Sequence, residues 1–292
     1  FVVWLVFDFA IFINKRKKIN KIIENLSIYP SDFPTPKDCI EKDYQSIINH
    51  LYSMIEKSIS KIEKNNNEQS EYYTMWVHQI KTPISAIRLA VSTEKENIPT
   101  NTRNIIETEL FKIEQYTEMA LQYAKMQNLS SDMVIEKSNI LALIKESVKK
   151  YAPLFIYKKL SLELDDNLDF EAYTDKKWFS FLFEQLISNS IKYTHSSGSI
   201  KIYADENKRI VITDSGIGIS SSDINRIFEK GFTGTNGRID KKASGIGLYM
   251  VKKISEELKI KIEITSEIGK GTTVFLKPPY EETEIFDNIT NL

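Results

Sequence analysis

Apolar and polar positions follow a helical period through the first half of the chain. Over residues 71–92 apolar side chains recur at steps of three and four, which predicts a helix with one buried stripe. The residues of this stripe are Trp76, Ile80, Ile84, Ile87 and Val91. A second amphipathic helix is expected over about 102–127, with one side made of Ile106, Leu110, Ile113, Thr117, Ala120 and Ala124. Together they predict a helical hairpin with an open apolar face, which pairing into a dimeric four-helix bundle would cover.

A longer helical pattern begins upstream, at about Asp43, and carries a short heptad-like seam. The members of this seam are Tyr44, Ile48, Leu51, Ile55 and Ile62. Because a coiled-coil seam requires a partner helix, it also favours a dimer. Residues 29–36 precede this helix and hold three prolines, so they cannot be helical throughout.

The first segment of the chain is an apolar run, Phe1 to Ile13, interrupted only by Asp8 and followed by a basic cluster at 15–18. A bilayer span takes roughly 20 residues, so this run alone is too short. We expect residues 1–14 to be the end of a transmembrane helix that begins before this sequence. The protein would then be located in the cell membrane, and the basic cluster would place the residues after about 15 on its cytoplasmic side. An interfacial anchor and an uncleaved signal segment are the alternatives.

After about residue 132 the pattern changes to short β-rich runs between helices. Helices are expected near 139–152 and 175–193, and the β-rich runs lie at 160–164, 199–204, 208–213, 260–265 and 272–277. This order predicts an α+β domain whose largely antiparallel sheet is covered on one face by helices. The polar, acidic tail from Glu281 is expected to fray.

Composition narrows the function classes. At 292 residues with 41% hydrophobic content, the chain can bury a real core and divide into two or more units. The net charge of −1 provides no basic field for nucleic acid, so no direct nucleic-acid partner is expected. Cys39 is the only cysteine, which excludes a disulfide framework, and only three histidines are present, which disfavours a zinc cluster. A reducing, cytoplasmic setting fits this composition.

His78 is the candidate nucleophile of the first helix. It lies two residues from both Trp76 and Ile80, so at about 100° per residue it points away from the apolar stripe, toward water. Thr82 shares this outer face, and Pro83 removes one amide donor, so a local bend is expected there. An outward imidazole on a stiff helix suits a nucleophile that must meet bulky partners. A lone histidine more often has a structural role, so a chemical role for His78 depends on motifs elsewhere in the chain.

Three glycine signatures follow one another in the second half, at 214–218, 245–248 and 269–273. Glycine lets the backbone approach a ligand closely and adopt positive φ. Asp214 ends a predicted strand, so its carboxylate could accept a hydrogen bond from an exocyclic amine such as that of adenine. The helix after Gly247 offers N-terminal amides to phosphate. Residues 226–243, between the first two signatures, have the polar, glycine-bearing composition of a mobile lid. Each glycine pair alone is a weak signal, but three around one lid indicate a nucleotide site.

An asparagine inside a very apolar helix is the other candidate in this half. Asn189 lies in the predicted helix over 178–193, where it lowers helix propensity and needs a polar partner. Its carbonyl oxygen is a hard ligand suited to Mg²⁺, which binds few protein groups together with nucleotide phosphates. The alternative is a polar residue on a solvated edge, with Lys192 an ordinary surface lysine.

These motifs together resemble those of bacterial sensor histidine kinases of two-component systems. The segment around His78 resembles their phosphoacceptor box, and Asn189 with the lysine and tyrosine that follow resembles their asparagine box. The glycine signatures resemble the nucleotide-binding boxes, and Phe228 to Phe232 resembles the phenylalanine box of the lid. The match runs in family order from about Glu71 to Leu276. The strings WVHQIKTPI, GFTGTNGR and GIGLYMVKK resemble more narrowly the intramembrane-sensing kinases of the bacitracin-sensor type, which work beside peptide-antibiotic ABC transporters.

The resemblance implies a multidomain α and α+β fold. A dimerising helical hairpin would be followed by an α/β-sandwich ATP-binding domain of the histidine-kinase, gyrase and chaperone type. The implied domains are the end of a membrane helix (1–14), a juxtamembrane linker and signalling helix (15–68), a dimerisation and phosphotransfer hairpin (69–130), a catalytic domain (131–280) and a flexible tail (281–292).

The resemblance also implies the activity: ATP-dependent autophosphorylation of His78, then phosphoryl transfer to an aspartate of a response regulator, in cell-envelope stress or antimicrobial-peptide sensing. Asp214 would bind adenine and Asn189 would hold Mg²⁺. The other implied contacts to the nucleotide are Lys192, Tyr193, Gly216, Gly218, Phe228, Phe232, Gly245, Gly247, Leu248 and Thr272. The implied partners are a second copy of the chain, a cognate response regulator and an ABC transporter permease.

One position departs from the family pattern. Many members have an acidic residue directly after the histidine, where this chain has Gln79, which cannot take the proton from the imidazole Nδ1. Loss of a general base typically costs on the order of 10²–10⁴ in rate. We therefore expect a slow autokinase, in which Gln79 orients the ring or helps Thr82 to position water for a phosphatase activity.

The same nucleotide fold also serves other classes of protein. ATP-hydrolysing machines such as DNA gyrase, the MutL family and a heat-shock chaperone resemble one another in placing a glutamate four residues before the metal-binding asparagine. Here that position is Gln185, and those proteins have nothing like the His78 box. A phosphatase-dominant kinase and a non-catalytic, nucleotide-binding dimeric adaptor remain as alternatives.

Overall fold

The computed structural model describes residues 2–24, 33–36, 38–126, 129, 133–234 and 244–286. It forms two compact units, of which the first ends at Gln69 and the second begins at Ser70. The boundary falls within one long helix, α2 (Cys39–Thr93), so that this helix contributes to both units.

The first unit consists of α1 (Val2–Glu24) and the beginning of α2. The apolar side chains near the start of α1 are all exposed, among them Val2, Trp4, Phe7 and Phe9. Lys15, in the basic cluster of α1, forms an ion pair with the α2 residue Glu41. Of the helices that the structure describes, none combines the length and the apolar character that a bilayer crossing requires.

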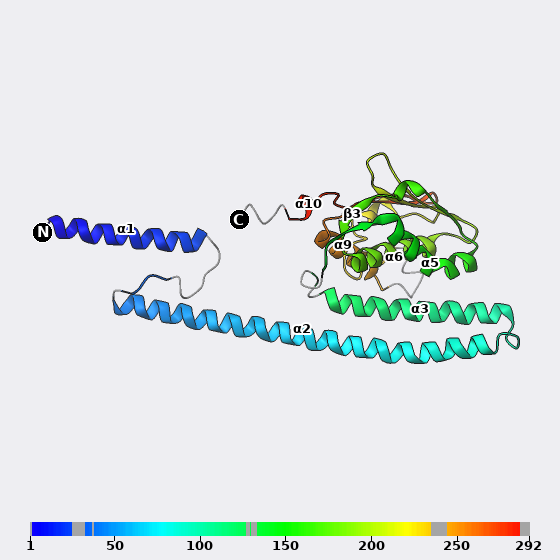
Figure 1. Cartoon of the computed structure of the whole chain (residues 1–292), viewed down its shortest axis with the longest axis horizontal. Helices are drawn as coiled ribbons and strands as arrows, with labels where there is room; N and C mark the ends of the chain where they lie inside the picture. The colour runs from blue at the N-terminus through cyan, green and yellow to red at the C-terminus, as the bar shows by residue number, and fades with distance from the viewer. Residues whose placement is uncertain are drawn as a thin grey trace. The chain divides into compact units, whose positions relative to one another are not determined.

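The second unit opens with a helical hairpin, as predicted. Figure 1 shows α3 (Thr100–Lys125) returning alongside the end of α2. Two ion pairs join the helices: Lys81 Nζ lies 3.6 Å from Glu118 Oε2, and Arg88 Nη2 lies 2.9 Å from Glu114 Oε2. The helix continues across Pro83.

The predicted apolar stripe of this part of α2 is only partly correct. Ile84 and Val91 are buried, but Trp76 and Ile87 are 51% and 47% exposed, and the third buried residue is Val77. The buried positions therefore recur at steps of seven, a narrower stripe than steps of three and four would give. The physical reason is that a single chain supplies one partner helix, which covers only part of an amphipathic face that is wide enough for two.

The remainder of the second unit is an α+β sandwich around a mixed five-stranded sheet. The strand order is β2-β4-β5-β7-β6, with bounds Ser161–Leu164, Ser199–Ala204, Ile210–Asp214, Gly271–Lys277 and Lys261–Glu267. Only the β2–β4 pairing is parallel. The prediction of a largely antiparallel sheet is confirmed, and each of the five β-rich runs overlaps one of these strands, although β5, β6 and β7 extend one or two residues beyond their runs.

Three helices cover one face of this sheet: α5 (Ile140–Lys158), α6 (Lys176–Tyr193) and α9 (Gly247–Glu257). The shorter elements are η3 (Asp166–Leu168), α7 (Ser221–Ile224) and α10 (Thr283–Phe286). A small antiparallel sheet of β1 (Glu136–Asn139) and β3 (Glu171–Thr174), which the sequence pattern did not predict, lies beside them. Its strands have four residues each, too few to display a period.

The core explains where the helices begin and end. Trp178, Phe179 and Phe183 of α6 are fully buried, and the Asp175 carboxylate starts that helix by accepting the Trp178 amide at 2.9 Å. Helix α5 was predicted to end near residue 152, yet it continues past Pro153 to Lys158. The prediction was too short because buried apolar positions continue beyond the proline, and their burial outweighs the lost hydrogen bond.

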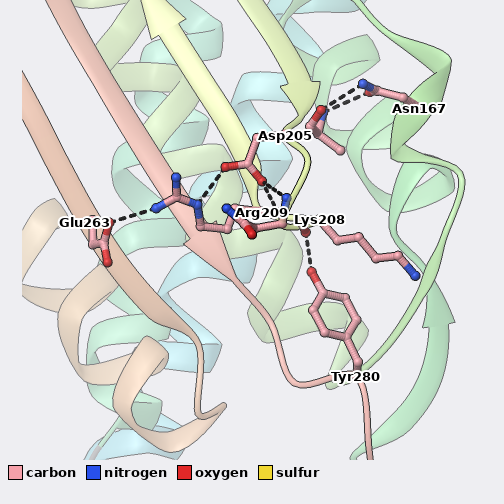
Figure 2. Close-up of polar contacts among 8 residues, drawn as sticks. Asn167, Asp205, Lys208, Arg209, Glu263 and Tyr280 are labelled. Carbon is pink, nitrogen blue, oxygen red and sulfur yellow. Dashed lines mark hydrogen bonds and ion pairs between the residues drawn. The ribbon is translucent and has the colours of Figure 1, made fainter.

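A group of polar contacts surrounds the β4–β5 turn (Figure 2), which precedes Ile210, whereas Asp214 is at the other end of β5. In the β4–β5 turn, Asp205 Oδ2 accepts a hydrogen bond from Arg209 Nε at 2.7 Å, and Arg209 Nη1 reaches Glu263 Oε2 of β6 at 2.9 Å. The hydroxyl of Tyr280, in the segment after β7, donates to the Lys208 carbonyl. These contacts join the β4–β5 turn to β6 and to the segment after β7. Asp214 lies at the opposite end of β5.

Candidate functional site

A cavity of about 640 Å³ lies at the end of β5 where Asp214 is placed. Most of the predicted nucleotide residues line it, namely Asn189, Lys192, Tyr193, Asp214, Gly218, Phe232, Gly245, Gly247, Leu248 and Thr272. Gly216 and Phe228 do not line it. The Gly216 amide donates a hydrogen bond to the Asp214 carboxylate, and Phe228 packs against the hydrophobic core. Segments far apart in the sequence therefore meet around one volume large enough for a nucleotide.

Asp214 is the buried carboxylate of this cavity, with 7% of its surface exposed. Its Oδ1 accepts hydrogen bonds from the backbone amides of Gly216 at 2.9 Å and Thr272 at 3.2 Å. Burial raises the pKa of Asp214, and these two amides together with the Ser190 hydroxyl partly offset that rise. The result is a mostly buried hydrogen-bond acceptor that the backbone holds in place.

The first and third glycine signatures are brought together by backbone packing. Gly271 has φ +115°, and a Cβ there would lie 1.9 Å from the Asp214 carbonyl oxygen. Gly218 has φ +70°, and a Cβ there would lie 2.1 Å from the Glu267 carbonyl oxygen. The Gly269 amide also donates to the Ile217 carbonyl at 2.9 Å. Only glycine permits this approach, so the two signatures form one wall of the cavity.

The second glycine signature packs against the first part of the predicted lid, through Gly245 and Gly231. Gly245 has φ +66°, and a Cβ there would lie 2.5 Å from the Gly231 carbonyl carbon. The Gly231 amide donates to the Gly245 carbonyl at 3.0 Å, so the described residues before and after 235–243 are hydrogen-bonded to each other. Residues 235–243 of the predicted lid lie outside the described residues. Near its start, the Arg226 guanidinium lies 4.5 Å from the ring centroid of Phe232.

Helix α6 carries several of the polar residues that line the cavity. Asn189, Lys192 and Tyr193 are half-buried in its last turns, and Lys192 Nζ lies 5.2 Å from the Tyr193 ring centroid. Gln185 also lines the cavity, and its Oε1 is only 3.0 Å from where a Cβ on Gly247 would be. We did not predict Gln185 as a site residue, although its position four residues before Asn189 is the signal that could have found it.

The neighbouring glutamate has a different role. Glu184 is buried, and its Oε2 pairs with Lys150 Nζ of α5 at 2.6 Å. Burial raises the pKa of Glu184, and the hydrogen bond from Lys150 partly offsets this. The position that a catalytic glutamate occupies in ATP-hydrolysing relatives of the fold is therefore an amide in this cavity, while the nearby carboxylate is held by a lysine.

His78, Gln79 and Thr82 are not among the cavity residues. All three side chains are exposed on α2, and the Thr82 hydroxyl donates to the His78 carbonyl at 3.2 Å. That bond supports the backbone just before Pro83. The structure thus brings most of the predicted nucleotide residues together in one cavity, and the candidate nucleophile is exposed elsewhere, on α2.

Helix α3 contributes to the cavity as well, which the sequence did not indicate. Phe111, Gln115 and Met119 are among its lining residues. Phe111 also meets the ring of Tyr151 of α5 edge-on, with centroids 5.3 Å apart, and the Tyr151 hydroxyl lies 2.5 Å from Gln115 Oε1. Burial raises the pKa of Tyr151, so this hydroxyl is a donor. No local sequence signal marks such contacts between distant segments.

The fold and the cavity define an ATP-binding domain. Residues 174–282 match the family described as histidine kinase-, DNA gyrase B- and HSP90-like ATPase. The architecture is also that of the full-length ShkA crystal structure, a complex with AMPPNP, at a TM-score of 0.51. That similarity covers 73% of this chain and 46% of the ShkA chain at 16% sequence identity, so it supports the fold.

Two curated relatives extend the similarity beyond the ATP-binding domain. The chain is 30% identical over 264 residues to the sensor histidine kinase GraS of Staphylococcus haemolyticus, which covers 88% of this chain and 75% of GraS. It is 30% identical over 228 residues to the sensor histidine kinase YxdK of Bacillus subtilis, which covers 77% of this chain and 69% of YxdK.

The chain belongs to the sensor histidine kinases, and the resemblance found from its motifs is confirmed, including the narrower type. It is a protein-histidine kinase that uses ATP. Family membership also implies that it acts as a dimer with a cognate response regulator.

Proposed function

We propose that ATP binds in the cavity around Asp214 and phosphorylates His78, which then passes the phosphoryl group to an aspartate of the response regulator. The observation that carries this proposal is the convergence of Asp214, Asn189, Lys192 and the glycine backbone on one cavity, within the same unit as an exposed His78. A buried acceptor beside cationic and amide donors suits a nucleotide.

Each part of the nucleotide has a matching group. The Asp214 carboxylate accepts the adenine amino group. Lys192 and Tyr193 supply a charge and a hydroxyl for the phosphates. Helix α9 begins at Gly247 on the cavity wall, and no side chain among the described residues caps its first amides, which leaves them available to phosphate oxygens.

Asn189 is the proposed Mg²⁺ ligand. Among the described residues no group of three or more histidines, cysteines, aspartates and glutamates could hold a metal. A half-buried amide on the cavity wall fits a hard cation that takes most of its other ligands from phosphates and water. When bound, the ion would neutralise charge on the transferring phosphoryl group.

His78 is the proposed nucleophile. Its side chain is exposed on α2, and an imidazole nitrogen that carries a lone pair can attack phosphorus to form a covalent intermediate. As Nε2 bonds to the γ-phosphorus, the bond from that phosphorus to the bridging oxygen breaks and ADP leaves. The Nδ1 proton passes to water, since Gln79 cannot accept it. This makes a slow autokinase the expected behaviour.

The membrane and transporter partners belong to the same proposal. The exposed apolar start of α1 and the basic residues that follow it support a membrane attachment, with the kinase on the cytoplasmic side. The strings WVHQIKTPI, GFTGTNGR and GIGLYMVKK support an ABC transporter permease as a partner in sensing cell-envelope stress or antimicrobial peptides.

Incubation with γ-³²P-labelled ATP and Mg²⁺ tests the proposal. We expect acid-labile, base-stable label on the protein, because phosphohistidine has these properties. The label should be absent in His78→Gln and should persist in His195→Gln, a matched change at another exposed histidine. Protein that binds ATP but never acquires label would instead favour the non-catalytic adaptor.

A further inference from the structure

Lys158, the last residue of α5, places its ammonium against the end of another helix. Its Nζ donates to three backbone carbonyls, those of Ile191 at 2.6 Å, Lys192 at 2.9 Å and Thr194 at 3.0 Å. An ammonium has three N–H donors, so all of them are used. The acceptors lie at the C-terminus of α6, where carbonyls lack helical partners and the helix dipole favours a cation.

The turn that receives this ammonium also supports the nucleotide cavity. The Tyr193 carbonyl accepts the Ile217 amide at 3.2 Å, which attaches the loop after Asp214 to the end of α6. Ser190 lines the same cavity as Asp214, and its hydroxyl partly offsets the rise that burial causes in the pKa of Asp214. Asn189, Lys192 and Tyr193 lie in the same turn. One turn of helix therefore positions both the proposed adenine acceptor and the proposed phosphate residues.

We propose that Lys158 is a positioning residue for nucleotide binding. Its ammonium holds the last turn of α6 in the geometry that binds ATP, and this turn positions the proposed adenine acceptor and the proposed phosphate residues. The inference rests on the proposed function of this cavity. Lys158 lines the cavity, but its donors are committed to carbonyls, so it acts through α6 and makes no phosphate contact.

The surroundings of Lys158 fit this role. The side chain is half-buried, and burial lowers the pKa of Lys158, with the neighbouring charge of Lys112 on α3 adding to the effect. A cation kept in a partly dry place needs compensating acceptors, and the three carbonyls supply them. The backbone carbonyl of the same residue accepts the Ser197 amide at 3.1 Å, so Lys158 anchors both sides of the α6–β4 connection.

Dissociation constants for ATP, ADP and adenosine test the inference, measured on the full chain by displacement of a fluorescent ATP analogue. We expect Lys158→Met to weaken all three ligands about tenfold, the order expected for loss of a charge-assisted hydrogen-bonding group. Lys158→Arg, which keeps the charge and the donors, should recover most of the affinity. Lys149→Met, a matched change at an exposed lysine of the same helix, should have no effect.

The pattern across ligands distinguishes positioning from direct contact. A loss of affinity confined to ATP and ADP would mean that Lys158 touches phosphate. Wild-type affinity in a folded Lys158→Met protein would mean that the contact between the Lys158 ammonium and the end of α6 is irrelevant to binding. Either result overturns the inference. Should the Met variant not fold, Lys158→Gln is the milder change, and unaltered affinity there is equally decisive. Wild-type protein that fails to bind ATP would instead refute the nucleotide site itself.

Discussion

Gln79 follows His78 directly on α2, and both side chains are exposed to solvent. The Thr82 hydroxyl one turn later is bonded to the His78 carbonyl. Neither the Gln79 amide nor the Thr82 hydroxyl is basic enough to take the proton from the imidazole Nδ1. At the scale of single residues, the step that limits the proposed chemistry is removal of this proton.

We expect Gln79→Glu to raise the autophosphorylation rate, because a carboxylate beside His78 can act as the missing base. General-base assistance typically contributes on the order of 10²–10⁴ in rate, and a gain of at least about tenfold is expected even from imperfect geometry. The measurement is the initial rate of labelling at saturating ATP. Gln69→Glu, the same change at another exposed position of α2, is the control, and an unchanged or lower rate in Gln79→Glu would contradict this account.

Among the elements, the β6–β7 turn determines the shape of the cavity wall. It contains two glycines with positive φ, Gly269 at +78° and Gly271 at +115°, but their surroundings differ. A Cβ on Gly269 would meet no atom within 4 Å, whereas a Cβ on Gly271 would lie 1.9 Å from the Asp214 carbonyl oxygen. A substitution at Gly269 therefore tests the backbone conformation alone, whereas one at Gly271 tests the backbone conformation together with the close approach to Asp214.

Alanine at each position should show this difference. Gly269→Ala is expected to lower the free energy of unfolding by about 1–2 kcal/mol, the cost of a left-handed conformation for a residue with a Cβ. Gly271→Ala should cost about 3 kcal/mol or more and abolish ATP binding, because β7 must move away from Asp214. Urea denaturation followed by circular dichroism, with ATP binding on the folded fraction, measures both. Equal losses at the two positions would be inconsistent with the close approach.

For the whole molecule, the decisive feature is the apolar surface that the hairpin leaves uncovered. Ile87 of α2 and Ile113 of α3 are 47% and 43% exposed in a single chain, although both belong to the predicted apolar faces. Family membership implies a dimer, and burying such residues against a second copy is what would complete a four-helix bundle. Leu89 is more exposed, at 68%, but lies outside the predicted stripe.

Aspartate substitutions at these positions test which face pairs. Ile87→Asp should shift the protein to monomer, since a carboxylate in the bundle core would lose its hydration without a partner. Leu89→Asp should leave the dimer intact, because that side chain would stay in water. Sedimentation velocity over a range of protein concentrations reports the outcome. Dissociation in the Leu89 variant alone would show that another face of the hairpin pairs.

Local sequence patterns were enough to predict the family and most of the elements. The five strands, the two hairpin helices and the glycine signatures follow from local periods and local backbone needs, which any short window displays. Pattern reasoning failed where the cause was not local. It missed the four-residue strands β1 and β3, and it ended α5 too early because burial of that helix beyond Pro153 depends on what packs against it.

Only the tertiary structure decided which separated residues meet. Gly271 is constrained by the Asp214 carbonyl, Gln185 by Gly247, and Lys158 by the end of α6. None of these pairs shares a window of sequence, and no period relates their positions. Packing of the helices on the sheet sets such distances, since a contact between distant segments depends on every element that lies between them.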